Sequence, residues 1–290
     1  MRRIMVATDF SERSDRALRR ATILARGAGA DLVIVHVVDD DQPARIVETE
    51  RAAAEDLLRE QTATVREMDG VPCERRVVLA DPFAGIVEMA ADLGPDLVVI
   101  GPHRRQALRD VFVGTTAERV IRSVGRPVLM ANAPPVGPYR HALLATDLSE
   151  ASAQALRAFR ALGLGGAERA PRATALHVFD APALQLVGTR EMPRDQRAHY
   201  IEDARLEAGR ALAHFLGETG AGPLEQTVCP VETTAANGIL AAAEEVRADL
   251  VVVGTRGLSG LARLILGSVA ESVLRTADRD VLAVPPAPAA

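Results

Sequence analysis

Residues 249–274 read DLVVVGTRGLSGLARLILGSVAESVL. A short β-branched run comes first, then a glycine-rich stretch with the spacing G-x-x-G, nine residues, and Gly267-Ser268, then a segment with helical spacing. Gly254 can turn the chain out of a strand, and Gly257 lets backbone amides approach an anion without a Cβ in the way. A helix that begins after Gly267 has free amides and a positive dipole end there. The glycines could instead only form tight turns, but strand, spacing and helix coincide, so the stretch predicts an anion-binding loop.

Four segments of the second half of the chain have counterparts in the first half, and these counterparts follow one another in the same order. The matching pairs of segments are 3–12 and 141–150, 31–38 and 172–179, 96–101 and 249–254, and 114–120 and 267–273. Fixed order over the whole length indicates domain duplication. Between the copies, residues 133–138 read APPVGP, and prolines disfavour both helix and central strand. We therefore predict two domains, residues 1–136 and 137–290.

Each copy alternates short apolar runs with helical patterns. In the first copy we expect strands at 5–7, 32–38, 77–79, 97–100 and 128–130, and helices at 14–26, 46–68, 82–92 and 116–123. Strands that alternate with helices imply right-handed crossovers and a doubly wound parallel sheet. The predicted fold class is α/β, with one five-stranded parallel sheet per copy and helices on both faces. Ligands bind such sheets at the carboxyl ends of the strands.

Composition narrows the class of protein. The 290 residues are 48% hydrophobic and 25% charged, which suits two folded domains, and no apolar run approaches the roughly 20 residues that span a bilayer. Residues 1–9 are typical of a first strand and not of a signal peptide. The net charge of −5 and 3% aromatic content argue against nucleic-acid binding. Cys73 and Cys229 are far apart, so we expect reduced thiols and a cytoplasmic protein. The chain has no lysine, which excludes a P-loop lysine and Schiff-base chemistry.

Two strand ends complete a family pattern. Thr146-Asp147 closes the first strand of the second copy and His177-Val178 closes the second. Together with the glycine loop, they resemble the ATP-binding subfamily of universal stress proteins, here in a tandem form that covers nearly the whole chain once per half. The resemblance implies a Rossmann-like, adenine nucleotide alpha hydrolase-like fold that binds ATP, with AMP or ADP as alternatives. It implies no metal site made by the protein alone, although Mg²⁺ could accompany ATP.

In the second copy the resemblance implies a nucleotide site in which Asp147 and Val178 surround the adenosine and the loop holds the phosphates. The candidate residues are Thr146, Asp147, Val178, Gly254, Thr255, Arg256, Gly257, Gly267, Ser268 and Val269. Asp147 has an alternative role as a helix N-terminal residue beside Ser149.

The first copy departs from the pattern because Arg104 stands where the second copy has Gly257. The weaker candidates there are Thr8, Asp9, Val37, Gly101, His103, Arg104, Gly114, Thr115 and Thr116. Arg104 could pair with a phosphate in a remodelled anion site, or obstruct backbone approach. We favour obstruction, and with it loss or weakening of this site.

The sequence offers no convincing catalytic base. It contains no G-x-S-x-G, H-E-x-x-H or kinase-type motif, and no carboxylate or cysteine recurs beside both His36 and His177, so a core or strand-cap role is favoured for them. We expect a stress-response regulatory module that binds an adenine nucleotide, mainly in the second domain. The alternatives are a slow ATPase or phosphotransfer enzyme, and a nucleotide-free dimeric scaffold. The two halves should form an intrachain pseudo-dimer with 128–130 and 281–284 at or near the contact, and a homodimer of the whole chain stays open.

Overall fold

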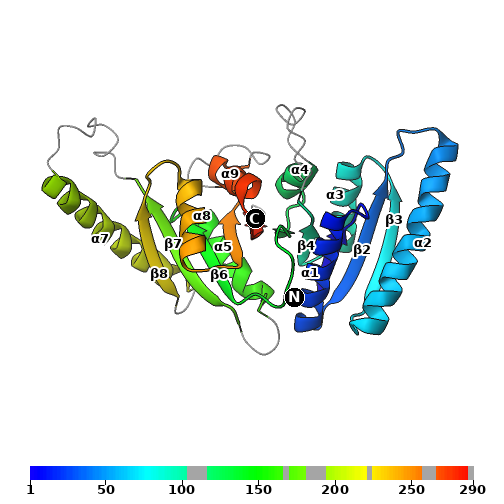
Figure 1. The fold of residues 1–290 in the computed structure, drawn as a ribbon, viewed down its shortest axis with the longest axis horizontal. Helices are drawn as coiled ribbons and strands as arrows, with labels where there is room; N and C mark the ends of the chain where they lie inside the picture. Colours follow the sequence, from blue (N-terminus) through cyan, green and yellow to red (C-terminus); the bar gives the residue numbers. More distant parts are fainter. Residues whose placement is uncertain (103–115, 166–169, 181–193, 221–223, 257–265, 287–290) are drawn as a thin grey trace.

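The computed structural model describes residues 1–102, 116–165, 170–180, 194–220, 224–256 and 266–286. In the first half, strands and helices alternate as β1 (Arg3–Ala7), α1 (Glu12–Ala28), β2 (Asp31–Val38), α2 (Ala44–Met68), β3 (Cys73–Leu79), α3 (Pro82–Leu93), β4 (Leu97–Ile100), α4 (Thr116–Ser123) and β5 (Val128–Met130). The second half follows as β6 (His141–Thr146), α5 (Glu150–Leu162), β7 (Arg172–Phe179), α7 (Arg194–Thr219), β8 (Glu225–Pro230), α8 (Ala235–Glu245), β9 (Leu250–Gly254), α9 (Ser268–Thr276) and β10 (Asp280–Val284) (Figure 1).

The strands form one ten-stranded sheet, in the order β3-β2-β1-β4-β5-β10-β9-β6-β7-β8. Within each half all neighbouring strands are parallel, as predicted. The two halves join through β5 and β10, which pair antiparallel with Leu129 opposite Leu282. The two predicted five-stranded sheets are therefore continuous, because the last strand of each half supplies the backbone partners that the other lacks. The strand order reverses between β1 and β4 and between β6 and β9, and such switch points are where ligands bind.

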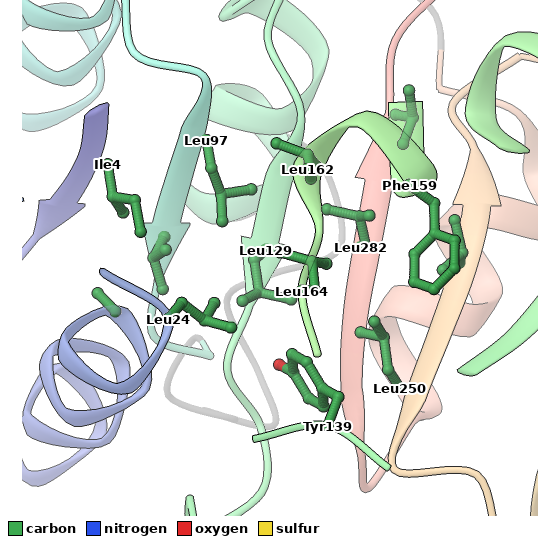
Figure 2. Packing of buried hydrophobic residues seen from close by; sticks show 14 of the residues in the cluster. Ile4, Leu24, Leu97, Leu129, Tyr139, Phe159, Leu162, Leu164, Leu250 and Leu282 are labelled. Carbon is green, nitrogen blue, oxygen red and sulfur yellow. The ribbon is translucent and has the colours of Figure 1, made fainter. Parts of the chain in front are cut away.

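Helices cover both faces of the sheet, as the sequence predicts. One apolar core packs α1, α2, α5 and α7 against the sheet, and a second packs α3, α4, α8 and α9 against the opposite face. Figure 2 shows the first core at the junction, where Leu129 of β5, Leu282 of β10 and Tyr139 lie among side chains from both halves. The apolar interior thus runs across the junction without a break.

A buried polar cluster lies beside this junction. The Asp280 carboxylate, fully buried on β10, pairs with Nε of Arg20 on α1 at 2.8 Å and accepts hydrogen bonds from the Tyr139 hydroxyl and the Ala133 N–H. Arg20 also donates to the Gly137 carbonyl at 2.7 Å. Burial and the neighbouring Asp280 carboxylate raise the pKa of Tyr139 well above its usual value. These contacts fix the segment between the halves against both of them.

The longest helices, α2 and α7, cover the outer strands of the sheet. Helix α2 buries a single row of side chains, including Val47, Leu58 and Val65, and exposes charged residues elsewhere. No helix in the described ranges is long and apolar enough to cross a membrane.

Candidate functional site

A tight turn follows the first strand of each half. Leu148 adopts φ 64° and its counterpart Phe10 adopts φ 58°, a left-handed conformation that is uncommon for residues other than glycine. The turn is held by its own side chains, because the Leu148 N–H donates to the Thr146 hydroxyl at 2.9 Å. The backbone is thus turned sharply at the carboxyl end of β6, next to the point where the strand order reverses.

Asp147 lies at the start of α5, as one of the two roles considered for it requires, and it also lies at a cavity. Ser149 is the N-cap of α5, and Oδ1 of Asp147 accepts hydrogen bonds from the Ser149 N–H, the Ser149 hydroxyl and the Ser152 hydroxyl. Asp147 also lines a cavity beside the sheet. The hydroxyl groups therefore fix the carboxylate that faces this cavity.

His177 stabilises the same turn from the neighbouring strand. Its Nδ1 lies 3.0 Å from the Thr146 carbonyl oxygen, which can only accept, so Nδ1 carries the proton. His36 makes the equivalent contact with Thr8 at 2.8 Å. Of the core and strand-cap roles that the sequence left open for both histidines, these contacts match the strand cap.

The cavity in the second half has a volume of about 250 Å³, just below the roughly 300–1,000 Å³ of most small-molecule sites. The cavity is lined by most of the candidate residues that the sequence indicated in this half, namely Thr146, Asp147, Val178, Gly254, Arg256, Gly267, Ser268 and Val269. Gly257 lies outside the described residues. The structure thus brings residues from three strand ends and from the start of α9 to one concave site.

Helix α9 begins at the wall of this cavity. Its N-cap, Gly267, is extended and has no side chain to cap the helix, so amides of the first turn lack partners within the helix. Arg256, which is partly buried and carries a guanidinium, lines the cavity as well. Unpaired amides, the positive end of the helix dipole and a guanidinium together favour a bound anion.

Thr255 supports the loop and does not line the cavity. It is buried, its N–H donates to the Val284 carbonyl at 2.9 Å, and its own carbonyl accepts from the Gly267 N–H at 2.9 Å. These two bonds connect the end of β9 to β10 and to the start of α9. Thr255 therefore positions the loop, and its predicted contact with a nucleotide stays a prediction.

Gly254 is required for a different reason from the sharp turn that we expected. It is the last residue of β9 and its φ lies outside the left-handed region. A Cβ at this position would lie 3.3 Å from the Arg256 carbonyl oxygen and 3.5 Å from that of Ala151 on α5. Close approach of the loop to the start of α5, not turning, explains the glycine.

The sequence missed the part of the cavity wall that comes from helix α8, from the strand interiors and from single residues of α5 and α9. The residues concerned are Ala145, Ser152, Leu176, Ala235, Ile239, Val253 and Ala270. One signal was present: Gly238-Ile239 repeats Gly85-Ile86 of the first half. A Cβ on Gly238 would lie 3.2 Å from a methyl group of Val178, so this glycine lets α8 close over the strand that carries Val178.

The first half contains an equivalent cavity of about 550 Å³. Its wall includes five of the predicted residues, Thr8, Asp9, Val37, Gly101 and Thr116, together with others that we did not predict, Arg13 among them. His103, Arg104, Gly114 and Thr115 lie outside the described residues, so the expected obstruction by Arg104 stays a prediction. The described part of the first half nevertheless keeps an open cavity at the switch point.

The Asp9 carboxyl in this cavity is held in its charged form. Burial alone would raise its pKa, but hydrogen bonds from Ser11 and Ser14 outweigh burial, so the pKa lies below its usual value. Asp9 is therefore an anionic hydrogen-bond acceptor at neutral pH.

The helices that begin at the two cavities are connected to each other. Nε of Arg275, in the last turn of α9, pairs at 2.9 Å with Glu118, a buried residue in the first turn of α4.

No group of three or more His, Cys, Asp or Glu side chains suited to a metal ion occurs in the part of the chain that the structure describes.

The architecture is a tandem of doubly wound α/β domains, each with a cavity at its switch point. The family model described as universal stress protein family matches residues 1–132 and 138–285. Universal stress protein E of Escherichia coli (strain K12) is 26% identical over 301 residues, covering 98% of this chain and 93% of that protein. Universal stress protein MJ0531 of Methanocaldococcus jannaschii is 50% identical over 142 residues, covering 46% of this chain and 83% of that one.

Among solved structures, a universal stress protein from Archaeoglobus fulgidus covers 98% of this chain and 96% of its own, with a TM-score of 0.72. At 20% identity this likeness concerns the fold. The family model, however, matches nearly all of the chain in two copies. The chain belongs to the universal stress protein family.

Proposed function

We propose that this chain is a stress-response regulatory module that binds an adenine nucleotide, with ATP held mainly by the second half. The observation that carries the proposal is the convergence of Asp147, Arg256 and the start of α9 on one cavity. An acceptor on one wall and anion-favouring groups on another match a ligand with hydroxyl groups at one end and phosphates at the other.

The residues divide into three roles. The α9 amides at Ser268 and the Arg256 guanidinium would hold phosphate oxygens, while Asp147 would accept hydrogen bonds from ribose hydroxyls. Leu176, Val178 and Ile239 supply apolar surface for the adenine ring. Mg²⁺ would arrive with the nucleotide and neutralise phosphate charge.

The experiment is Ser268→Pro, which removes one amide donor and leaves the helix intact. Ser268 is the first helical residue, where proline is well tolerated, and Gly267 has φ −63° and ψ 142°, which suits a residue before proline. Loss of one charge-assisted hydrogen bond costs about 1.5–3 kcal/mol, so the ATP affinity of the full chain, measured by calorimetry, should fall about 10- to 100-fold.

Ser268→Ala is the matched control, because it removes the hydroxyl and keeps the amide. It should bind ATP more tightly than Ser268→Pro, and both variants should keep the wild-type melting temperature measured without nucleotide. Equal ATP affinity in the two variants would show that the α9 amide does not contact phosphate.

We further propose that the domains divide at residues 136 and 137 and act as an intrachain pseudo-dimer in the cytoplasm. The β5–β10 pairing supports the pseudo-dimer, and the free thiols of Cys73 and Cys229 suit a reducing compartment. A phosphate-release assay with the purified chain and Mg·ATP tests the alternative of a slow ATPase. Sustained turnover that Ser268→Pro removes would favour that enzyme over a binding module.

A further inference from the structure

Helix α9 is fixed at both of its ends, and the partners at the two ends come from different halves of the chain. At its start, the Gly267 N–H donates to the Thr255 carbonyl of the same half. At its end, the side-chain amide of Asn132 donates to the carbonyl oxygens of Ala277 at 3.3 Å and of Arg279 at 3.0 Å. Asn132 comes two residues after β5, in the first half. The first half thus supplies the donor that binds these two carbonyl groups.

The first half makes a second contact with the same end of α9. Arg275, in the last turn, pairs through Nε with the buried Glu118 of α4 at 2.9 Å and through Nη2 with Glu271 at 3.1 Å. Glu118 and Glu271 occupy equivalent positions in the repeat, each in the first turn of its helix. One guanidinium therefore links α4 to α9, which lie side by side next to the junction of the halves (Figure 1).

Among the described residues, the second half does not return these two contacts to α4. The repeat places Pro285 where the first half has Asn132, and proline has no side-chain donor. It places Arg122 where the second half has Arg275, and Nε of Arg122 donates to the Glu118 carbonyl of its own helix at 3.2 Å. The half with the complete glycine pattern is therefore supported by the half in which that pattern is interrupted.

The end of α9 matters for a ligand because the start of the same helix forms the anion-favouring wall of the cavity. The helix has nine residues and is about 14 Å long, and its backbone hydrogen bonds keep it rigid, so a tilt at its end displaces the amides at Ser268. A hydrogen bond to a phosphate oxygen tolerates only a few tenths of an ångström of displacement. The residues proposed to contact adenosine, by contrast, lie on or next to β6, β7 and α8.

We propose that Asn132 and Glu118 are positioning residues for the phosphate site of the second half, and that this site is complete only when the first half fixes the end of α9. This inference rests on the proposed function for the ligand at that site. The first half is then a structural component of nucleotide binding by the second half, whatever ligand the first half itself binds.

The test compares ATP with adenosine by calorimetry on the full chain. Asn132→Ala removes both bonds to the end of α9 without touching the cavity, so ATP affinity should fall about three- to tenfold, less than for loss of a phosphate contact itself. Adenosine has no phosphate and should bind this variant and the wild-type chain equally. Glu118→Met, which removes a partner of Arg275 and keeps a side chain of similar size, should separate the two ligands in the same way. Arg122→Met is the matched control on α4 and should change neither affinity.

The ratio of the two affinities separates positioning from a general loss of stability. Thr219→Ala removes a buried hydrogen bond to the Leu216 carbonyl in α7, far along the chain from α9, and should lower the melting temperature without changing this ratio. Unchanged ATP affinity in Asn132→Ala, or an equal loss of adenosine affinity, overturns the inference while the wild-type chain still binds ATP.

Hydrogen exchange tests the inference without any nucleotide. The Glu271 N–H, bonded to the Gly267 carbonyl at 2.9 Å in the first turn of α9, should exchange about threefold faster or more in Asn132→Ala than in the wild-type chain. If the wild-type chain does not bind ATP, the proposed function is wrong. Faster exchange at Glu271 then still supports positioning of α9 by the first half, and unchanged exchange overturns it.

Discussion

The buried ion pair between Arg20 and Asp280 is the contact whose loss should cost the most stability. We consider Asp280→Asn, which removes the charge that faces Arg20 and keeps one acceptor oxygen, whereas the carboxylate accepts from the Ala133 N–H through Oδ1 and from the Tyr139 hydroxyl through Oδ2. The two side chains are only 5% and 0% exposed, so water cannot replace the lost partner. Arg20 keeps its bond to the Gly137 carbonyl and its position over the Tyr139 ring, but no carboxylate then balances its buried charge.

The magnitude follows from this burial. Removal of one partner from a buried ion pair costs about 3–5 kcal/mol, and the retained acceptor places Asp280→Asn near the lower end, at about 3 kcal/mol. For a chain of this size 1 kcal/mol corresponds to about 2–4 °C, so the melting temperature should fall by about 6–12 °C. Because Arg20 and Asp280 belong to different halves, both halves should lose stability together.

Calorimetric melting and urea denaturation without nucleotide measure the effect, since bound ligand would itself add stability. Asp278→Asn is the control: Asp278, two residues before Asp280, pairs with the adjacent Arg279 but is 78% exposed, so its loss should cost less than about 1 kcal/mol. Adding Arg20→Met to Asp280→Asn should recover stability, because the buried cation is then absent. The reasoning fails if Asp280→Asn costs no more than the control, or if the two changes are simply additive.

Two further predictions concern the first half. Gly101→Ala should destabilise the chain by about 1–3 kcal/mol in urea denaturation, because the new Cβ would lie 2.8 Å from the Arg13 carbonyl oxygen. Gly254→Ala, whose new Cβ would have its closest contact at 3.3 Å, should cost less. Equal costs for the two variants would contradict the explanation by close approach. Ser11→Ala should raise the pKa of Asp9 toward its ordinary value of 3.8, followed by carboxyl NMR. Because the pKa of Asp9 is lower in the folded protein, the Asp9 carboxylate stabilises the fold above about pH 3.8, and this stabilisation is lost as the pH falls through the pKa of the folded state. The loss of stability at acid pH should therefore be smaller in Ser11→Ala.

Much of the fold could be predicted because buried parallel strands are short and β-branched. The expected strand 97–100 agrees with β4, all of whose residues are buried. Strand β3 was predicted only for its last three residues, because it begins at Cys73 and continues through Glu74, Arg75 and Arg76. An edge strand with exposed side chains has no continuous apolar run, so hydropathy detects only part of it.

The site was predictable where its residues lie in one continuous motif or in a repeated one. Asp147 and Gly267 could be found because strand ends and helix starts have local signals. Ile239 could not be assigned from its own segment, because only the tertiary packing of α8 on β7 brings it to the cavity. The pair of Arg20 with Asp280 spans 260 positions, and no local pattern distinguishes Asp280 from an ordinary polar residue at a strand start.

The pairing of β5 with β10 also has a consequence for the order of events during synthesis. About 150 residues of chain separate the two strands, which at about 5–20 residues per second take roughly 8–30 s to produce. Throughout that interval a folded first half would present β5 without its neighbour. A second ribosome on the same message carries an identical β5 nearby, and antiparallel pairing of two such strands is the competing reaction. The rate at which the second half is translated and folds therefore determines whether β5 pairs with β10 of the same chain or with β5 of a second chain.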